Sequence, residues 1–155
     1  MDPVRCYTVG HSNHSKERLF NLLKQHGIKA LVDVRSAPYS RYVSHCNKGC
    51  LERWLANEGI DYFYLGNKLG GNNFRQYRSC ETHYSLRTLS DDTDITRAID
   101  LLIRYIVKYS YLGIMCAEGD PCRCHRFHVI TPLLKERGVE VVHILRDGSI
   151  FPHSS

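Results

Sequence analysis

The chain has 155 residues, of which 43% are hydrophobic and 24% are charged, and its formal net charge at pH 7 is +5. This balance is typical of one folded globular domain and excludes a disordered chain. A mildly basic chain is compatible with a nucleic acid or another polyanion as partner.

Apolar, β-rich runs alternate along the chain with segments of helical period. The first half predicts a strand over 4–10, a helix capped by Ser15 and ended by Gly27, a strand over 29–35, a helix over 51–59 and a strand over 60–65. The segment 66–89 has no clear period, and such a long irregular segment is often a functional loop or lid.

The second half continues the alternation. It predicts a helix over 94–110 capped by Asp94, a strand over 111–117, a helix over 124–137, a strand over 139–145 and a short edge strand over 150–153. Together these elements predict one α/β domain over 1–155. It is of the Rossmann-like three-layer kind, with about five mostly parallel strands and helices on both faces.

No apolar run approaches the ~20 residues of a membrane-spanning helix. The first ten residues, MDPVRCYTVG, lack the charged head and apolar core of a signal peptide, so we expect a cytoplasmic protein. The seven cysteines are irregularly spaced. In a cytosolic chain they predict free thiols, metal ligands or a catalytic cysteine and not a disulfide framework.

Polar clusters follow three of the predicted strands. His11 and Ser12 follow the first, Asp33 and Arg35 close the second, and CAEGDPCRCHR (116–126) follows the fourth. Ligands bind such sheets beyond the carboxyl ends of the strands, so we expect these clusters to line one cleft.

Four motifs occur in order over nearly the whole chain. They are GHS (10–12); DVR (33–35) followed by Pro38, Ser40 and Arg41; Tyr62 followed by LGG (69–71); and CAE (116–118) followed by Pro121 and CHR (124–126). With these motifs the chain resembles the family called domain of unknown function 488, a resemblance that implies membership and no activity. LVDVR and LGIMCAE give a fainter resemblance to rhodanese-type domains, in which a strand delivers a reactive cysteine into a loop.

The motif at 116–126 admits a thiol hypothesis and a metal hypothesis. Cys116 precedes a helix, whose N–H groups and dipole lower a thiol pKa, but Glu118 and Asp120 would raise it. A rhodanese-like sulfurtransferase or thiol enzyme using Cys116 is thus one alternative, and a buried structural cysteine is another. Cys116 could also join Cys122, Cys124 and His125 around zinc, but the usual paired knuckle is missing.

The first hypothesis is an enzyme acting on DNA, RNA or a nucleotide by excision or modification of a base. A carboxylate near a histidine and arginines can activate water or stabilise a cationic sugar. The alternative is an ion-pair network that ties loops together, such as Glu118 with Arg126 or Asp33 with Arg41. A non-enzymatic metal-stabilised or nucleic-acid-binding module is the third hypothesis.

For catalysis the sequence selects Glu118, Asp33, His11, His125 and Cys116. For substrate binding it selects Ser12, Arg35, Tyr39, Ser40, Arg41, Tyr42, Tyr62, Gly70, Gly71, Tyr77, Cys124 and Arg126. Loop tyrosines would stack on bases while arginines hold phosphates. No cofactor motif is visible and no metal ligand set is selected. We expect Trp54 to lie in the core and His143 to be a buried, hydrogen-bonded histidine.

Overall fold

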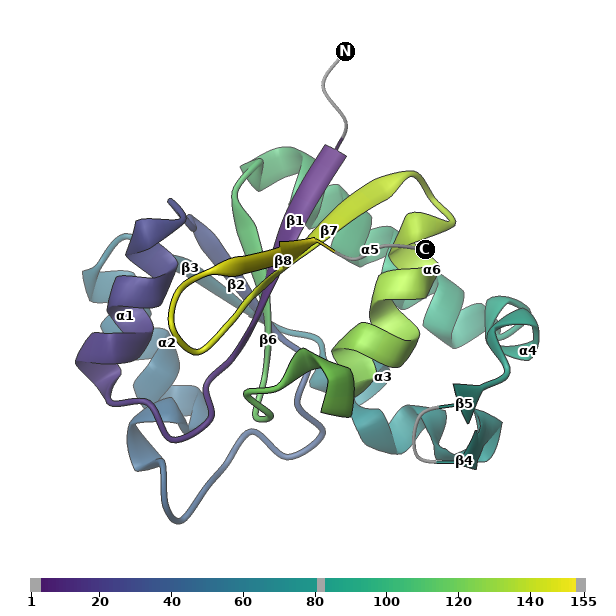
Figure 1. Cartoon of the computed structure of the whole chain (residues 1–155), viewed down its shortest axis with the longest axis horizontal. Helices are drawn as coiled ribbons and strands as arrows, with labels where there is room; N and C mark the ends of the chain where they lie inside the picture. The colour runs from purple at the N-terminus through teal and green to yellow at the C-terminus, as the bar shows by residue number, and fades with distance from the viewer. Residues whose placement is uncertain (1–3, 81–82, 153–155) are drawn as a thin grey trace.

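The computed structural model describes residues 4–80 and 83–152. Six strands form one sheet in the order β3-β2-β6-β1-β7-β8 (Figure 1). Their bounds are β1 (Val4–Gly10), β2 (Ala30–Asp33), β3 (Asp61–Tyr64), β6 (Leu112–Cys116), β7 (Val139–Ile144) and β8 (Ile150–Pro152). The first five run parallel, and β8 pairs antiparallel with β7. The predicted α/β class is confirmed. The final residue predicted for the edge strand, His153, lies outside the described residues.

Helices cover both faces of the sheet (Figure 1). One face carries α1 (Lys16–Gln25) and α2 (Lys48–Asn57), and the other carries α5 (Thr93–Tyr109) and α6 (Thr131–Lys135). Successive strand residues point to opposite faces, so each strand supplies both hydrophobic clusters. Thus Leu31 packs with the α1 side and Val32 with the α5 side.

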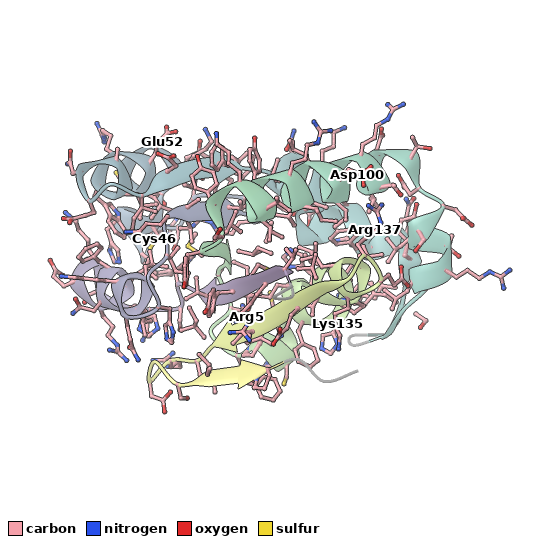
Figure 2. All side chains as sticks on the ribbon, turned by 90° about the horizontal axis from the view of Figure 1, so that it is seen from above. Arg5, Cys46, Glu52, Asp100, Lys135 and Arg137 are labelled. Carbon is pink, nitrogen blue, oxygen red and sulfur yellow. The ribbon has the colours of Figure 1, made fainter. Side chains whose placement is uncertain are left out.

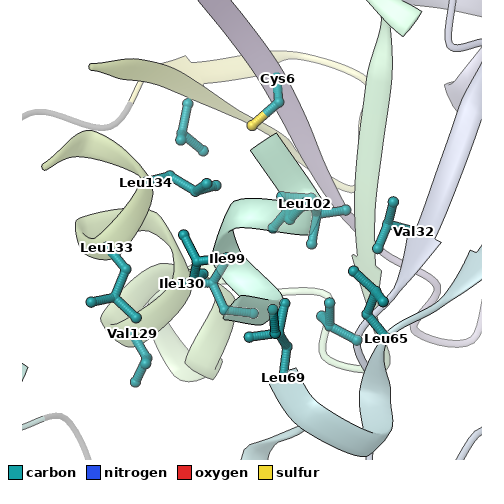
Figure 3. Close-up of a cluster of buried hydrophobic side chains, with 14 of the residues drawn as sticks. Cys6, Val32, Leu65, Leu69, Ile99, Leu102, Val129, Ile130, Leu133 and Leu134 are labelled. Carbon is teal, nitrogen blue, oxygen red and sulfur yellow. The ribbon is translucent and has the colours of Figure 1, made fainter. Parts of the chain in front are cut away.

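The two cores are built from helix stripes against the sheet. Leu19, Leu22 and Leu23 of α1 and Trp54 of α2 are buried in the first core, as predicted for Trp54. Figure 3 shows the second core, where leucine and isoleucine side chains of α5 and α6 meet the sheet. At the surface, Arg137 pairs with Asp100 of α5, which ties these two helical segments together (Figure 2).

Local sequence signals set the ends of α1 and the start of α5. The Ser15 side chain accepts a hydrogen bond from the N–H of Arg18, and Gly27 follows α1 with φ +69°. The cap predicted for α5 was wrong by two residues. Asp92, not Asp94, accepts from the first-turn N–H groups, because its extended backbone places the carboxylate beside them.

The segment after β6 forms a helix of two kinds. A π-helix spans Arg126–Ile130 and continues directly into α6. The carbonyl of Arg126 accepts from both the backbone N–H and the hydroxyl of Thr131, which fixes the wide turn. A helix was predicted over 124–137, and the structure has one over Arg126–Lys135, whose first part is wider than α-helical.

The irregular segment folds into short elements that pack against α5 and the π-helix. They are α3 (Gly66–Leu69), a 3-10 helix (Gly71–Tyr77), the hairpin β4 (Arg78–Cys80) and β5 (His83–Tyr84), and α4 (Leu86–Ser90). Two further 3-10 turns span Ser44–Cys46 and Pro121–Arg123. Within 4–80 and 83–152, no helix has the length and apolarity to cross a membrane.

Candidate functional site

The carboxyl ends of β1, β2 and β6 meet at one edge, because these three strands are adjacent and parallel. Gly10 lies opposite Cys116, and the N–H of His11 donates to the Cys116 carbonyl at 2.9 Å. A Cβ at Gly10 would lie 1.8 Å from the carbonyl oxygen of Glu118. Only glycine therefore allows the loop after β6 to cross this close to β1.

Asp33 and Arg35 form a buried ion pair at the end of β2. The Arg35 side chain donates to both Asp33 carboxylate oxygens at 2.9 and 2.8 Å, and the Arg35 backbone N–H adds a third bond at 3.0 Å. The Tyr62 hydroxyl donates to the same carboxylate at 2.6 Å, and Arg35 also donates to the Cys46 carbonyl. Burial and this hydrogen bond raise the pKa of Tyr62 well above its usual range. These predicted site residues are brought together as a network that fixes the loop after β2.

His11 and Ser12 also make hydrogen bonds that hold the loops at this edge of the sheet. His11 is buried, one of its ring nitrogens lies 2.9 Å from the Ser12 carbonyl, and burial lowers its pKa. Ser12 has a left-handed backbone, φ 47°, and accepts a hydrogen bond from Arg146. Neither residue lines the pocket described below.

Two cysteines meet beneath the loop after β6. The sulfur atoms of Cys116 and Cys124 are 2.7 Å apart, and both side chains are buried. The guanidinium of Arg126, which is completely buried, donates to the Cys116 sulfur at 2.5 Å. A buried guanidinium favours a thiolate beside it, so this arrangement suits two sulfurs that share one negative charge and one proton.

Cys124 is the more exposed of the two, at 7% against 2% for Cys116. The hydrogen bond that Cys116 donates, together with His125 and Arg126, holds the pKa of Cys124 well below its usual range. Burial and the same hydrogen bond raise the pKa of Cys116. The backbone N–H of Arg126 also points at the Cys124 sulfur, at 3.5 Å. These contacts favour Cys124 over Cys116 as the site of the shared negative charge.

Arg126 is held from behind by a chain of buried polar groups. Its Nε donates to the Thr8 hydroxyl at 3.2 Å, and that hydroxyl lies 2.5 Å from Nδ1 of His143. Its terminal nitrogens donate to the carbonyls of Glu118 and Gly119. The predicted buried, hydrogen-bonded His143 is confirmed. The Thr8 hydroxyl accepts from Arg126 and also shares a hydrogen bond with Nδ1 of His143, in which either atom can be the donor.

Thr8→Val is expected to lower the free energy of unfolding by about 1–3 kcal/mol, because the shape is kept while Arg126 and His143 lose a buried partner. Thr8→Ser keeps the hydroxyl and is the matched control. Urea unfolding of the three proteins measures the difference. Equal midpoints for Thr8→Val and Thr8→Ser would contradict this role for the hydroxyl.

A pocket of about 480 Å³ opens in front of the cysteines, within the range of small-ligand sites. Its lining comprises Arg35, Ser36, Ala37, Gly71, Asn72, Arg75, Arg78, Tyr84, Cys116, Ala117, Glu118, Arg123, Cys124, His125 and His128. Glu118 is the single carboxylate among these lining residues, against four arginines and two histidines. The pocket is thus cationic, with the two sulfurs in its wall.

The predicted residues Glu118, His125, Gly70 and Gly71 lie in or beside this pocket. Glu118 is exposed, and its carboxylate accepts from the Asp120 N–H at 3.1 Å. One ring nitrogen of His125 lies 3.1 Å from the Val34 carbonyl. Gly71 lies on the lining, whereas a Cβ at Gly70 would come within 2.3 Å of the Ser36 hydroxyl.

Other predicted residues lie away from the pocket. The side chains of Tyr39, Arg41 and Tyr42 are exposed on the loop after β2, and the Ser40 hydroxyl accepts from two N–H groups of that loop. The Tyr77 hydroxyl donates to the Asp92 carboxylate. None of these five predicted residues is part of the pocket lining.

Sequence reasoning missed four basic residues of the pocket and the support behind it. The four are Arg75, Arg78, Arg123 and His128, and the support is Thr8 with His143. Arginine-rich spacing in 72–78 was the available signal, but without the fold it did not show which side chains face the cysteines. In the described ranges, no group of three or more His, Cys, Asp or Glu side chains is arranged to hold a metal ion.

Comparison with known proteins gives one family and no individual relative. The family model described as domain of unknown function DUF488 matches residues 15–133. No curated protein and no solved structure matches the chain.

Proposed function

This chain belongs to the DUF488 family, whose description names no activity, and we propose that it is a thiol enzyme in which Cys124 attacks an electrophilic sulfur and Cys116 resolves the adduct. One observation carries the proposal: the two sulfurs lie 2.7 Å apart in the wall of a pocket, beside the buried charge of Arg126. The proposal keeps the thiol hypothesis of the sequence but assigns the attack to Cys124 and the second step to Cys116.

The proposed chemistry is thiol–disulfide exchange. The Cys124 thiolate attacks one sulfur of a substrate S–S bond, that bond breaks, and the leaving thiolate departs with the electron pair. Cys116 then attacks the Cys124 sulfur, forms the Cys116–Cys124 disulfide and releases the second substrate thiol, which takes up the Cys116 proton. Two protein thiols are oxidised and one substrate disulfide is reduced. An external dithiol returns the pair to its reduced form.

The geometry favours this division of labour. Cys124 is the more exposed sulfur and has the lowered pKa, as a nucleophile needs. Cys116, the less exposed residue, has its sulfur 2.7 Å from that of Cys124, where it can attack an adduct formed on Cys124. Arg126 stabilises negative charge on either sulfur as the charge passes between them.

Single-cysteine variants test the proposal. After treatment with a small aromatic disulfide, peptide mass spectrometry is expected to find the Cys116–Cys124 disulfide in the native chain. Cys116→Ser is expected to retain a mixed disulfide on Cys124, because the resolving thiol is gone. In Cys124→Ser, any adduct at Cys116 is expected to form more slowly than the adduct at Cys124 forms in the native chain. The exposed thiols Cys50 and Cys122 provide internal references in the same digest. A native rate of adduct formation at Cys116 in Cys124→Ser would refute the assignment.

The second candidate is the nucleic-acid or nucleotide enzyme, and the cationic lining of the pocket favours it. Glu118 is the carboxylate placed to act there, whereas Asp33 is committed to Arg35. Labelled oligonucleotides that carry damaged bases test this candidate at low salt. Absence of binding to both single and double strands removes it, and binding without turnover that Glu118→Gln leaves unchanged would indicate a binding module.

A further inference from the structure

We infer that Arg75, Arg78 and Arg123 form an anion-binding rim, and that the thiol pair therefore acts on sulfur compounds that carry a carboxylate, sulfonate or phosphate group. The choice of substrate rests on the proposed function, whereas the anion site stands on the geometry of the rim. Two segments supply the three side chains: Arg75 and Arg78 lie three residues apart, in the 3-10 helix after α3 and at the start of β4, and Arg123 lies in the 3-10 turn after β6. All three line the pocket that contains Cys124.

Within the described ranges, the rim differs from Arg35 because no carboxylate is paired with its arginines, and from Arg126 because they are exposed. Arg35 is bonded to Asp33, and Arg126 is enclosed by sulfur and carbonyl acceptors. Among the described residues, no carboxylate pairs with Arg75, Arg78 or Arg123, and all three are exposed. Three positive charges on one pocket mouth repel one another and raise the local concentration of anions.

The remaining polar groups of the lining do not cancel this charge. Glu118 is the lining carboxylate, and its single negative charge is outnumbered by the three rim arginines. His128 is engaged with the Cys122 carbonyl at 2.7 Å, which holds the turn that carries Arg123. The turn is also fixed by Asp120, whose carboxylate accepts from the N–H of Cys122. Arg123 is therefore presented from a hydrogen-bonded turn.

The chemical class follows from the donors. Guanidinium groups bind planar or tetrahedral oxyanions through paired N–H donors, more tightly than they bind neutral oxygens. A pocket of about 480 Å³ admits a small molecule with the anionic group at the rim and the reactive sulfur at the cysteines. A neutral disulfide of the same size fits the pocket but leaves the rim unsatisfied.

Two aromatic disulfides of similar size test this specificity. One is a dithiobis(nitrobenzoate), which carries a carboxylate on each ring, and the other is dithiodipyridine, which is neutral. Both reagents release a coloured thiol, so stopped-flow absorbance gives the rate of each reaction. The ratio of the two rates with free mercaptoethanol gives the preference expected from intrinsic reactivity alone. At low salt the native chain is expected to prefer the anionic reagent by roughly tenfold relative to mercaptoethanol, and salt should reduce that preference.

The matched variants separate the rim from general charge. Arg75→Gln/Arg78→Gln/Arg123→Gln is expected to lose most of the preference, because the anion then lacks its partners. The control Arg53→Gln/Arg97→Gln/Arg104→Gln removes the same net charge from exposed sites elsewhere and is expected to keep the ratio within about twofold. The proposed anion-binding rim would be wrong if the native chain gave the same rate ratio as mercaptoethanol. It would also be wrong if both triple variants lost the preference for the anionic reagent equally.

A second measurement keeps the rim distinguishable from the thiol chemistry. In Cys124→Ser, which cannot carry out the proposed attack, sulfate is expected to raise the melting temperature, as any ligand of the folded state does. When Arg75→Gln/Arg78→Gln/Arg123→Gln is added to Cys124→Ser, sulfate is expected to raise the melting temperature by a smaller amount. If neither aromatic disulfide reacts at Cys116 or Cys124 while sulfate still stabilises, the thiol function fails and the anion site stands. If the thiols react but sulfate stabilises both variants equally, the rim fails and the thiol function stands.

Discussion

Asp33→Ala is expected to lower the free energy of unfolding by about 3–5 kcal/mol, because it leaves the Arg35 guanidinium buried without its counter-charge. The Asp33 and Arg35 side chains are 0% and 4% exposed, so both charges lie away from bulk water. Tyr62 loses its acceptor at the same time. Urea unfolding followed by circular dichroism measures the change as a lower midpoint.

Two further variants show whether that loss of stability comes from the buried ion pair. Glu140→Ala removes a carboxylate from the exposed pair with Arg5 and is expected to cost no more than about 1 kcal/mol. The double variant Asp33→Leu/Arg35→Met is expected to be more stable than Asp33→Ala, because no unpaired charge stays buried. Similar losses for Asp33→Ala and Glu140→Ala would show that the Asp33 pair does not hold the loop.

Arg126→Met is expected to raise the pH at which the cysteine pair becomes reactive. The rate of iodoacetamide alkylation follows the thiolate fraction, so it falls as the pH drops through the first pKa of the pair. In the native chain the pKa of Cys124 is lowered, and alkylation therefore persists in mildly acid solution. Loss of an adjacent positive charge raises such a pKa by about 1–3 units. Because the native pKa of Cys124 is about 4, the rate at pH 6 should then fall by up to roughly tenfold, with larger decreases at lower pH.

The control for this change removes the same charge from the surface. Arg104→Met on α5 is expected to leave the pH profile of Cys124 unchanged, whereas Arg126→Lys, which retains a charge, should restore part of the native profile. Mass spectrometry of the labelled peptides distinguishes alkylation of Cys50 and Cys122 from alkylation of the buried pair. Because Arg126 also supports the loop through the Glu118 and Gly119 carbonyls, circular dichroism must show a folded variant. An unchanged profile in folded Arg126→Met would contradict the role given to this charge.

The sequence predicted the class of fold because its signals are local. A helix cap such as Ser15, a helix-ending glycine such as Gly27 and an apolar run such as β6 each act within a few residues. The alternation of these elements then limits the architecture to a parallel sheet with helices on both faces. The cap of α5 was assigned to Asp94 because both Asp92 and Asp94 are suitable residues, and only backbone geometry selects between them.

The candidate site could be predicted only in part, because it depends on contacts between distant residues. An ion-pair network was one of the alternatives, but the partner of Asp33 is Arg35 and not Arg41. Arg126 contacts the Glu118 carbonyl and not its carboxylate. The meeting of Cys116 with Cys124 depends on the course of the loop between them, which no local signal specifies. The nucleic-acid hypothesis stays a prediction.

The place of β1 in the sheet has a consequence for folding. This strand, near the start of the chain, pairs with β6 on one side and β7 on the other, so both of its neighbours are made roughly a hundred residues later. Contacts of such sequence separation slow folding, since loop-closure entropy must be lost before they form. During synthesis, Thr8 cannot contact Arg126 and His143 until residue 143 has been made. The buried support of the Arg126 charge beside the cysteine pair is thus completed late.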